Sequence, residues 1–156
     1  MSDINHEFTR HRGPITCATH IPCSNQIITS GYDNAVALFD YTSMEVELLG
    51  YHEHLVNRVT VDGRGKLAAT ASSDYNVYIW DLTSKQVKTV LRGHNDAVED
   101  FVFLSASPGA SVSRDNRIII WNLSNGAIEK IILGHEKDVL SVNYTAGKLY
   151  TSGDDM

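Results

Sequence analysis

The sequence has few of the residues that define secreted or membrane-spanning proteins. Its 156 residues include only 2 cysteines, Cys17 and Cys23, which are too few for a disulfide framework and lack zinc-site spacing. The longest apolar runs, such as residues 118–121, are far too short to cross a bilayer. The amino-terminal segment has no apolar signal-peptide core. These absences predict a soluble globular domain of the cytoplasm or the nucleus that does not associate with membranes.

Basic charge and ligand-binding patterns are also scarce. The chain has 13 Lys and Arg against 19 Asp and Glu, a net charge of −6. This balance argues against non-specific nucleic-acid binding, because such binding needs a basic surface that displaces counterions from phosphates, and it leaves a local basic patch open. His52 and His54 form a His-x-His pair, but no carboxylate or cysteine spacing completes a metal site around it. We therefore expect no metal and no cofactor.

The sequence does contain an internal repeat. The aromatic residues Phe39, Trp80 and Trp121 follow one another at intervals of 41 residues, and an aspartate precedes each by six positions. A histidine and a hydroxyl residue keep the same register, and together with the aspartate they recur in four units. The four sets are His11, Thr29 and Asp33; His52, Thr70 and Asp74; His94, Ser111 and Asp115; and His135, Thr151 and Asp155. A repeat of this length predicts an architecture of stacked structural units.

Each unit divides into four short runs that are typical of β-strands. In the second unit, Val59 and Val61 alternate with polar neighbours, as in a half-buried strand, and the Gly-containing segment 62–66 predicts a turn. The third runs, at 36–39, 77–80 and 118–121, are almost wholly apolar and predict strands that are covered on both faces. In the third unit the first turn, at 105–110, is irregular. No segment predicts a helix of normal length, so the fold class is all-β.

These features resemble the WD40 repeat family. The resemblance rests on the repeat length, on Gly93-His94 at the start of a unit and on Trp80-Asp81 at the end of a strand. It covers about residue 6 to the end and implies a single domain, 1–156, of β-propeller blades with four antiparallel strands each. It implies blades at 13–50, 54–92 and 96–133, a partial blade at 137–156 with its first two strands, and an outer strand of a preceding blade at 6–10.

The number of units and some of their residues depart from the family pattern. The first unit has Arg10-His11 and Phe39-Asp40 in place of Gly-His and Trp-Asp, and the third ends in Trp121-Asn122. Closed propellers use about four to eight blades, whereas this sequence supplies about three and a half. An open stack exposes apolar blade sides and strand edges. We therefore expect an incomplete propeller, either a fragment of a longer one or a half-propeller that closes by self-association of two chains.

The repeated polar residues have a structural and a catalytic interpretation. The resemblance implies two hydrogen-bonded chains, Trp80–Thr70–His52–Asp74 and Trp121–Ser111–His94–Asp115. Their chemistry fits, because tryptophan only donates, a hydroxyl and a neutral imidazole do both, and a carboxylate only accepts. Phe39 would shorten the first unit's chain by one bond, worth about 1 kcal/mol. A hydrolase triad instead needs one concave site with an oxyanion hole. Repetition in every unit favours the structural role, so we expect no enzyme.

The resemblance also implies a binding surface on the face that carries two kinds of loop, those between blades and those between the second and third strands. The residues that it places there as partner contacts are Tyr32, Leu55, Asn57, Ser73, Glu99, Arg114 and Leu140, with Ala97, Asp138 and Asp154 beside them. Tyrosine and arginine are enriched in binding hot spots. An ordinary solvated loop face is the other interpretation. The function expected is a non-catalytic scaffold that binds a protein or peptide partner. The alternative is a sensor or regulatory segment of a longer multidomain protein whose effector or catalytic part lies outside this chain.

Overall fold

The computed structural model describes residues 10–105 and 107–155, and the described chain is built from strands and turns. The outer strand expected at 6–10 lies, apart from Arg10, outside the described residues. No helix in the described part is long and apolar enough to cross a membrane. The strands are β1 (Ile15–His20), β2 (Gln26–Gly31), β3 (Ala35–Asp40), β4 (Glu45–Tyr51), β5 (Val56–Val61), β6 (Leu67–Ser72), β7 (Asn76–Asp81), β8 (Gln86–Arg92), β9 (Val98–Phe103), β10 (Pro108–Ser113), β11 (Arg117–Asn122), β12 (Ala127–Leu133), β13 (Val139–Thr145) and β14 (Lys148–Gly153).

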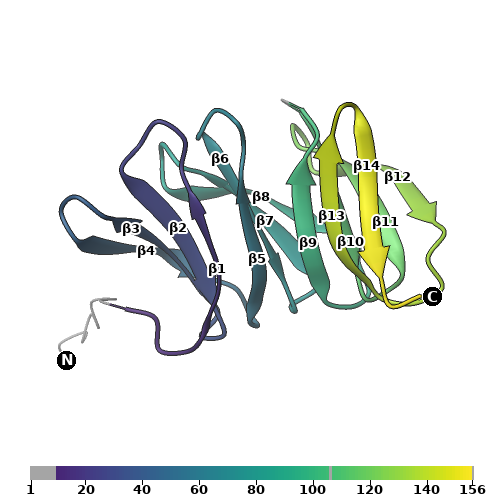
Figure 1. Ribbon diagram of the computed structural model, residues 1–156, viewed down its shortest axis with the longest axis horizontal. Coiled ribbons are helices and arrows are strands. Elements are labelled where there is room, and N and C mark those ends of the chain that lie inside the picture. The colour runs from purple at the N-terminus through teal and green to yellow at the C-terminus, as the bar shows by residue number, and fades with distance from the viewer. Residues whose placement is uncertain (1–9, 106, 156) are drawn as a thin grey trace.

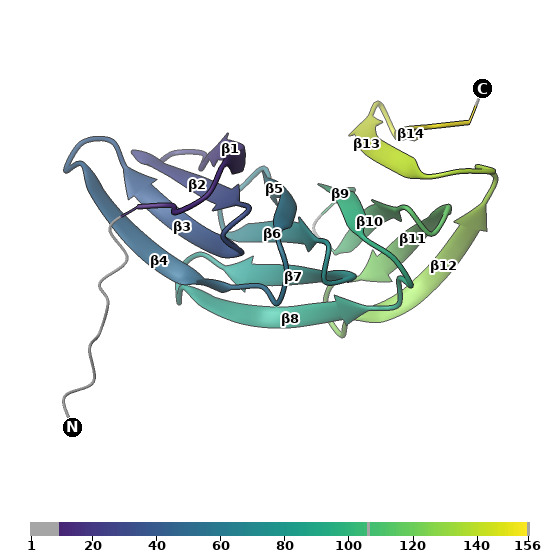
Figure 2. The same cartoon turned by 90° about the horizontal axis from the view of Figure 1, so that it is seen from below.

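The strands form consecutive antiparallel sheets. Three sheets have four strands, in the orders β1-β2-β3-β4, β5-β6-β7-β8 and β9-β10-β11-β12, and β13 pairs with β14. We call these sheets blades 1 to 4, and Figure 1 shows them side by side in chain order. Figure 2 shows that they form an open arc, with β1, β5, β9 and β13 on its concave side and β4, β8 and β12 on its convex side. The all-β fold of four-stranded propeller blades is confirmed, and the arc is an incomplete propeller.

The turns between the second and third strands are set by an aspartate and the residue that follows it. Asn34, Tyr75 and Asn116 have left-handed backbones, with φ of 66°, 73° and 65°. In each turn the preceding aspartate accepts the backbone N–H two residues further on, at 2.9–3.2 Å. Such side-chain contacts to the backbone are a recurrent means of fixing a tight turn. The repeat of aspartate therefore fixes the register of three hairpins.

One turn differs from its expected course. The sequence predicted an irregular turn at 105–110, but β10 begins at Pro108, so Pro108, Gly109 and Ala110 are in the sheet. Proline is tolerated as the first residue of a strand because no ladder hydrogen bond is lost there. Gly109 is required by its neighbour, since a Cβ at this position would lie 2.3 Å from the Phe101 ring. The sequence at the start of β10 therefore includes a glycine, because the large Phe101 ring of β9 lies beside it.

The apolar core lies between adjacent blades. One cluster joins Ile28, Val36 and Leu38 of blade 1 to Val59 and Trp80 of blade 2. The indole of Trp80 packs against the outer strand of blade 1, where a Cβ on Gly50 would lie 3.1 Å from the ring. Trp121 has the same relation to Gly93, at 3.0 Å. Each tryptophan therefore joins its own blade to the preceding one.

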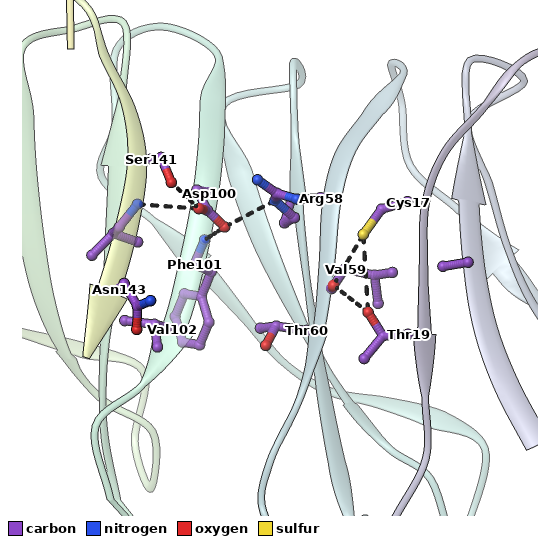
Figure 3. Close-up of a pocket in the computed structure, with 12 residues that line it drawn as sticks. Cys17, Thr19, Arg58, Val59, Thr60, Asp100, Phe101, Val102, Ser141 and Asn143 are labelled. Atoms are coloured by element: carbon purple, nitrogen blue, oxygen red, sulfur yellow. Dashed lines mark hydrogen bonds and ion pairs between the residues drawn. The ribbon is translucent and has the colours of Figure 1, made fainter. Parts of the chain in front are cut away.

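Polar side chains join the blades along the concave side. Thr16 donates to the carbonyl of Val56 at 2.5 Å, and Asn57 donates to the carbonyl of Val98 at 2.8 Å. Asp100, which is 5 % exposed, accepts from the backbone N–H of Val142 in blade 4 and lies 3.3 Å from Arg58 of blade 2. The Ser141 hydroxyl also donates to Asp100 at 3.1 Å, and Figure 3 shows Asp100 between Ser141 and Arg58 in a pocket of about 410 Å³. These contacts fix the curvature of the arc.

Candidate functional site

The polar chain of blade 2 contains all four of its expected members. His52 Nδ1 lies 2.8 Å from Asp74, His52 Nε2 lies 2.7 Å from the Thr70 hydroxyl, and Trp80 Nε1 donates to that hydroxyl at 2.8 Å. Every group is satisfied when Thr70 donates to Nε2 and a neutral His52 donates from Nδ1 to Asp74. The Asp74 oxygen also accepts the backbone N–H of Glu53, which ties down the loop between β4 and β5.

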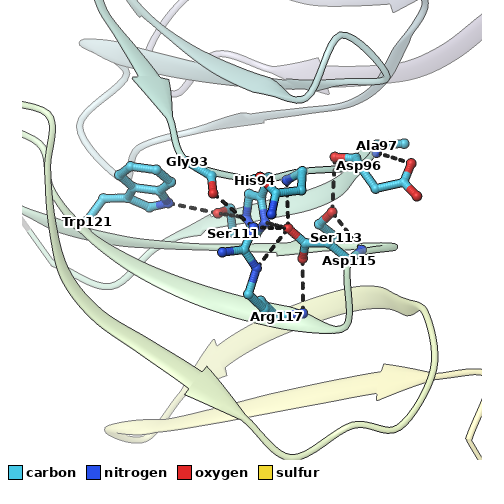
Figure 4. Close-up of polar contacts among 10 residues, drawn as sticks. Gly93, His94, Asp96, Ala97, Ser111, Ser113, Asp115, Arg117 and Trp121 are labelled. Carbon is cyan, nitrogen blue, oxygen red and sulfur yellow. Dashed lines mark hydrogen bonds and ion pairs between the residues drawn. The ribbon is translucent and has the colours of Figure 1, made fainter.

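Blade 3 has the same chain with one further member. His94 Nδ1 lies 2.9 Å from Asp115, and the Ser111 hydroxyl lies 2.7 Å from both His94 Nε2 and Trp121 Nε1. Figure 4 shows that Arg117 approaches Asp115 from the other side. Its Nη2 donates to Asp115 at 2.5 Å and to the carbonyl of Gly93 at 2.9 Å. The chain therefore ends on an arginine that also contacts the preceding loop.

Burial and charge shift the pKa values of this chain. Burial lowers the pKa of His94, and although Asp115 opposes this, Arg117 acts in the same direction as burial. Burial alone would raise the pKa of Asp115, but hydrogen bonds from Arg117 and from the backbone of Asn95, with His94 beside it, lower it to about 2. The result is a neutral imidazole beside a charged carboxylate at neutral pH.

In blades 1 and 4 a histidine, a hydroxyl residue and an aspartate form the same set, and no tryptophan bonds to it within the described residues. In blade 1, His11 lies 2.9 Å from both Asp33 and Thr29, and the Thr29 hydroxyl donates to the carbonyl of Ala37 at 3.3 Å. Phe39 has no N–H and adds nothing to this set. In blade 4, His135 lies 2.7 Å from Asp155 and 2.8 Å from Thr151. The histidine, hydroxyl and aspartate therefore assemble from two strands and their loops.

The hydroxyls in these chains are placed for structure. Thr70 and Ser111 are fully buried, and each already bonds to a histidine and a tryptophan. A nucleophile would instead have to face a substrate in a concave site. Among residues 10–105 and 107–155, no three His, Cys, Asp or Glu side chains are grouped as a metal site. The arrangement can brace a turn against a loop in every blade.

Two serines with a structural role were not predicted. The Ser72 hydroxyl donates to the carbonyl of Leu55 at 2.8 Å and accepts the N–H of Asp74 at 3.1 Å. The Ser72 hydroxyl also lies 3.2 Å from the carbonyl of His54. Ser113 makes the contacts equivalent to those with His54 and Asp74, to the carbonyl of Asp96 and from the N–H of Asp115, both at 3.1 Å. The two serines stand 41 positions apart, which is a usable signal. The first unit has Gly31 at this position, so the serine does not recur in all units.

The predicted contact residues lie on one edge of the arc, and some are bonded to one another. We call this edge the loop face. It is made by the loops 51–55, 93–97 and 134–138, by the turns 32–34, 73–75 and 114–116, and by the first residues of β5, β9 and β13, which include Asn57, Glu99 and Leu140. Tyr32 is 58 % and Leu140 37 % exposed, whereas Leu55 is half-buried in its loop. These three side chains offer apolar contact area at separate points of the loop face.

The polar contact residues form two matched pairs. Asn57 donates to the Ser73 hydroxyl at 3.1 Å in blade 2, and Arg114 donates to Glu99 at 2.5 Å in blade 3. The Arg114 side chain remains 51 % exposed, while that of Glu99 is 15 % exposed. Next to these pairs, the backbone N–H of Arg114 and of Asp154 donate at 3.0 Å to the carbonyls of Ala97 and Asp138. Arg114 is therefore a cation held in a fixed position at the surface.

Comparison with known proteins agrees with this geometry. The sequence pattern of the WD domain, G-beta repeat family matches residues 2–40, 45–81 and 84–122. The chain belongs to the WD40 repeat family. Among solved structures, the one titled "Structure of U3-55K" has a TM-score of 0.81 at 21 % identity and covers 88 % of this chain and 45 % of its own. The "Crystal structure of RRP9 WD40 repeats" has a TM-score of 0.80 at 22 % identity, with 88 % and 44 % covered. At these identities the likeness shows the fold.

Two curated relatives match the WD40 repeats in sequence. The periodic tryptophan protein 2 homolog of Dictyostelium discoideum is 28 % identical over 107 residues, which cover 65 % of this chain and 12 % of the relative. Autophagy-related protein 16 of Arabidopsis thaliana is 30 % identical over 112 residues, which cover 62 % and 22 %. The chain thus spans less than a quarter of either curated relative and less than half of either solved chain.

Proposed function

We propose that the chain is a non-catalytic platform that binds a protein or peptide partner through the loop face. The observation that carries the proposal is that every histidine, hydroxyl and aspartate set of the repeat is bonded internally. The repeated polar residues are then committed to the fold, and the exposed side chains between them are available for contact. The family favours the same role, because WD40 domains typically act as interaction scaffolds.

The exposed residues of the loop face suit such a contact. Tyr32 offers a large, rigid side chain, and Arg114 offers a guanidinium whose position is set by Glu99. Residues of these two types are enriched in binding hot spots. Tyrosine buries a large area at little entropic cost, and the contact with Glu99 already restrains Arg114. A partner that engages both residues would span the loop face from blade 1 to blade 3.

Affinity capture with matched variants tests the proposal. The test variant is Tyr32→Ala with Arg114→Ala. The control variant is Tyr41→Ala with Arg64→Ala, which removes an exposed tyrosine and an arginine from turns at the opposite edge. We expect a partner that the wild type and the control variant retain and the test variant loses. A partner that the test variant retains equally well would place the contact elsewhere and contradict the proposal.

A second candidate is that this segment serves as the sensor or regulatory part of a longer multidomain protein. The observation that favours it is the small share of the curated relatives, 12 % and 22 %, that the chain covers. Mass spectrometry of the protein from its natural source would give peptides beyond these 156 residues if the candidate holds. An intact mass of 17.3 kDa would contradict it.

Self-association is a further proposal for how the arc closes. Two chains would have to cover each other's end blades, so the solution mass would be twice that of the 17.3 kDa chain. A soluble monomer would contradict it. The proposed compartment is the cytoplasm or the nucleus, where Cys17 and Cys23, both free thiols, would stay reduced. Microscopy of the tagged protein would test this location.

A further inference from the structure

The turn between β10 and β11 contacts the loops on both sides of it. Arg117 donates from Nη2 to the carbonyl of Gly93 at 2.9 Å, in the loop that leads into blade 3. Asn116 donates from Nδ2 to the carbonyl of Glu136 at 3.1 Å, in the loop that leads into blade 4. The side chains of residues 114–117, which are the turn and the first residue of β11, therefore contact two loops of the loop face.

The equivalent turns of blades 1 and 2 contact neighbouring loops through their aspartate and the backbone, as when the His52 N–H donates to the carbonyl of Asn34 at 2.9 Å. They differ from blade 3 in the residue at the position of Arg117. At the position of Arg117 blade 2 has Asn76, which donates to the carbonyl of Asp74 within its own turn at 2.9 Å. Blade 1 has Ala35 there, whose side chain has no polar atom. The contact from the third strand back to the preceding loop is thus specific to blade 3 within the described blades.

The contact of Arg117 is charge-assisted and sheltered from water. The side chains of Arg117 and Asp115 are 18 % and 7 % exposed, and the guanidinium reaches the carboxylate through both Nε, at 3.0 Å, and Nη2. Charge-assisted bonds with two donors are about twice as strong as neutral ones and more specific in geometry. The charged groups that act on the His94 ring are Asp115 and Arg117, both of the same turn.

We propose that Arg117 is a positioning residue for the loop face, which fixes the loop 93–97 on the turn 114–117 before a partner binds. The same turn carries Arg114, whose backbone N–H donates to Ala97 and whose side chain holds Glu99. Arg117 thereby presets the geometry of the charged pair. The proposal rests on the proposed use of the loop face, but its test needs no partner, so the two can fail separately.

Amide hydrogen exchange of the whole free chain tests the positioning role. Arg117→Asn gives blade 3 the residue of blade 2, and Arg92→Asn is the matched control, since it removes an exposed arginine next to Gly93. We expect exchange in 93–97 to rise at least about tenfold in Arg117→Asn, as for loss of a hydrogen bond to a charged group. Exchange in the distant strand β2 should stay unchanged, which reports that the variant is folded. Equal exchange in 93–97 in wild type and Arg117→Asn, or an equal rise in the control, would overturn the proposal.

A pH profile separates positioning from a merely structural contribution. Because Arg117 acts to lower the pKa of His94, its removal should move the midpoint of the His94 imidazole titration to higher pH, as followed by NMR. Arg117→Lys keeps the charge, so the midpoint should stay near that of the wild type, while exchange in 93–97 should be intermediate because an ammonium lacks the forked geometry. An unchanged midpoint in Arg117→Asn would contradict the assigned role.

Discussion

Blades 1 and 2 contain the same three polar residues but differ in the aromatic residue beside them. The distances from histidine to hydroxyl are alike, 2.9 Å for His11 and 2.7 Å for His52. In blade 2 Trp80 donates to Thr70, which is fully buried, whereas in blade 1 Phe39 donates nothing and Thr29 is half-buried and bonds to a carbonyl. The tryptophan is therefore not needed to assemble the three polar residues.

The difference shows which part of the repeat joins the blades. Blade 4 has the complete polar set with two described strands, so the set belongs to β13, β14 and their loops. Trp80 and Trp121 lie instead in the clusters between blades, each against a glycine of the preceding outer strand or loop. The polar set braces one blade, and the tryptophan both completes it and ties that blade to its neighbour.

Removing Trp80 should have the largest effect on stability. Trp80→Ala leaves a cavity between blades 1 and 2 and a hydroxyl with one donor fewer, which should lower the free energy of unfolding by about 3–5 kcal/mol. Phe39→Ala, the matched change in blade 1, should have less than half that effect because Phe39 is only half-buried. Urea denaturation of both variants measures this, and equal losses would contradict the assigned role of Trp80.

Acid should weaken blade 3 in a defined direction. The folded pKa of Asp115, about 2, lies below its ordinary 3.8, so its contribution is complete above 3.8 and is lost as the pH falls towards 2. The pKa of His94 is also lowered, so below 6.5 the unfolded chain takes up a proton more readily than the folded one. Stability should fall from pH 7 to pH 3 in urea denaturation, and Asp115→Asn should flatten the lower part of the curve. A wild-type curve that rises with acid would refute these directions.

Supplying the missing donor to blade 1 should make it resemble blade 2. Phe39→Trp places an N–H near Thr29 and should raise the free energy of unfolding by about 1 kcal/mol, the net value of one hydrogen bond. Thermal unfolding of this variant measures the stability gained from the bond in blade 1. The same measurement on Trp80→Phe gives the stability lost with the equivalent bond in blade 2. A gain in the double variant Phe39→Trp, Thr29→Val would show that the effect comes from packing alone.

The smallest expected effect concerns the turn of blade 2. Tyr75 has a φ of 73°, where its counterparts Asn34 and Asn116 are of a type that tolerates the left-handed region. Tyr75→Asn should therefore stabilise the chain by about 0.5–1 kcal/mol through relief of backbone strain. Asn34→Tyr should do the opposite, and differential scanning calorimetry can resolve both shifts. No shift in either variant would mean that the turn is not strained.

The repeat made the fold predictable from the sequence, because the spacing of histidine and aspartate recurs in four units and that of the aromatic residue in three. The members of each polar chain follow from that register together with the donor and acceptor types of their side chains. Ser72 and Ser113 also share a register, but a glycine in the first unit hid their common role. The two serines align with each other when the second and third units are compared without the first.

Contacts specific to one blade could not be read from the repeat. Arg117 follows a turn in a strand, where its direction depends on the local backbone and on the position of the preceding loop. Asp100 looks like an ordinary polar residue of an alternating strand, yet it is buried because the neighbouring blades supply its partners. Such contacts depend on how one blade packs on the next, and the spacing of residues within a blade does not encode that packing.

We infer that the repeated histidine, hydroxyl and aspartate sets hold the fold together. The free energy of unfolding of Asp74→Ala and of the wild type, measured by urea denaturation, tests this, together with an ester-hydrolysis assay of both proteins. We expect a loss of about 3 kcal/mol, because a buried network loses its terminal acceptor, with no change in hydrolysis. Unchanged stability together with a loss of hydrolytic activity would contradict it.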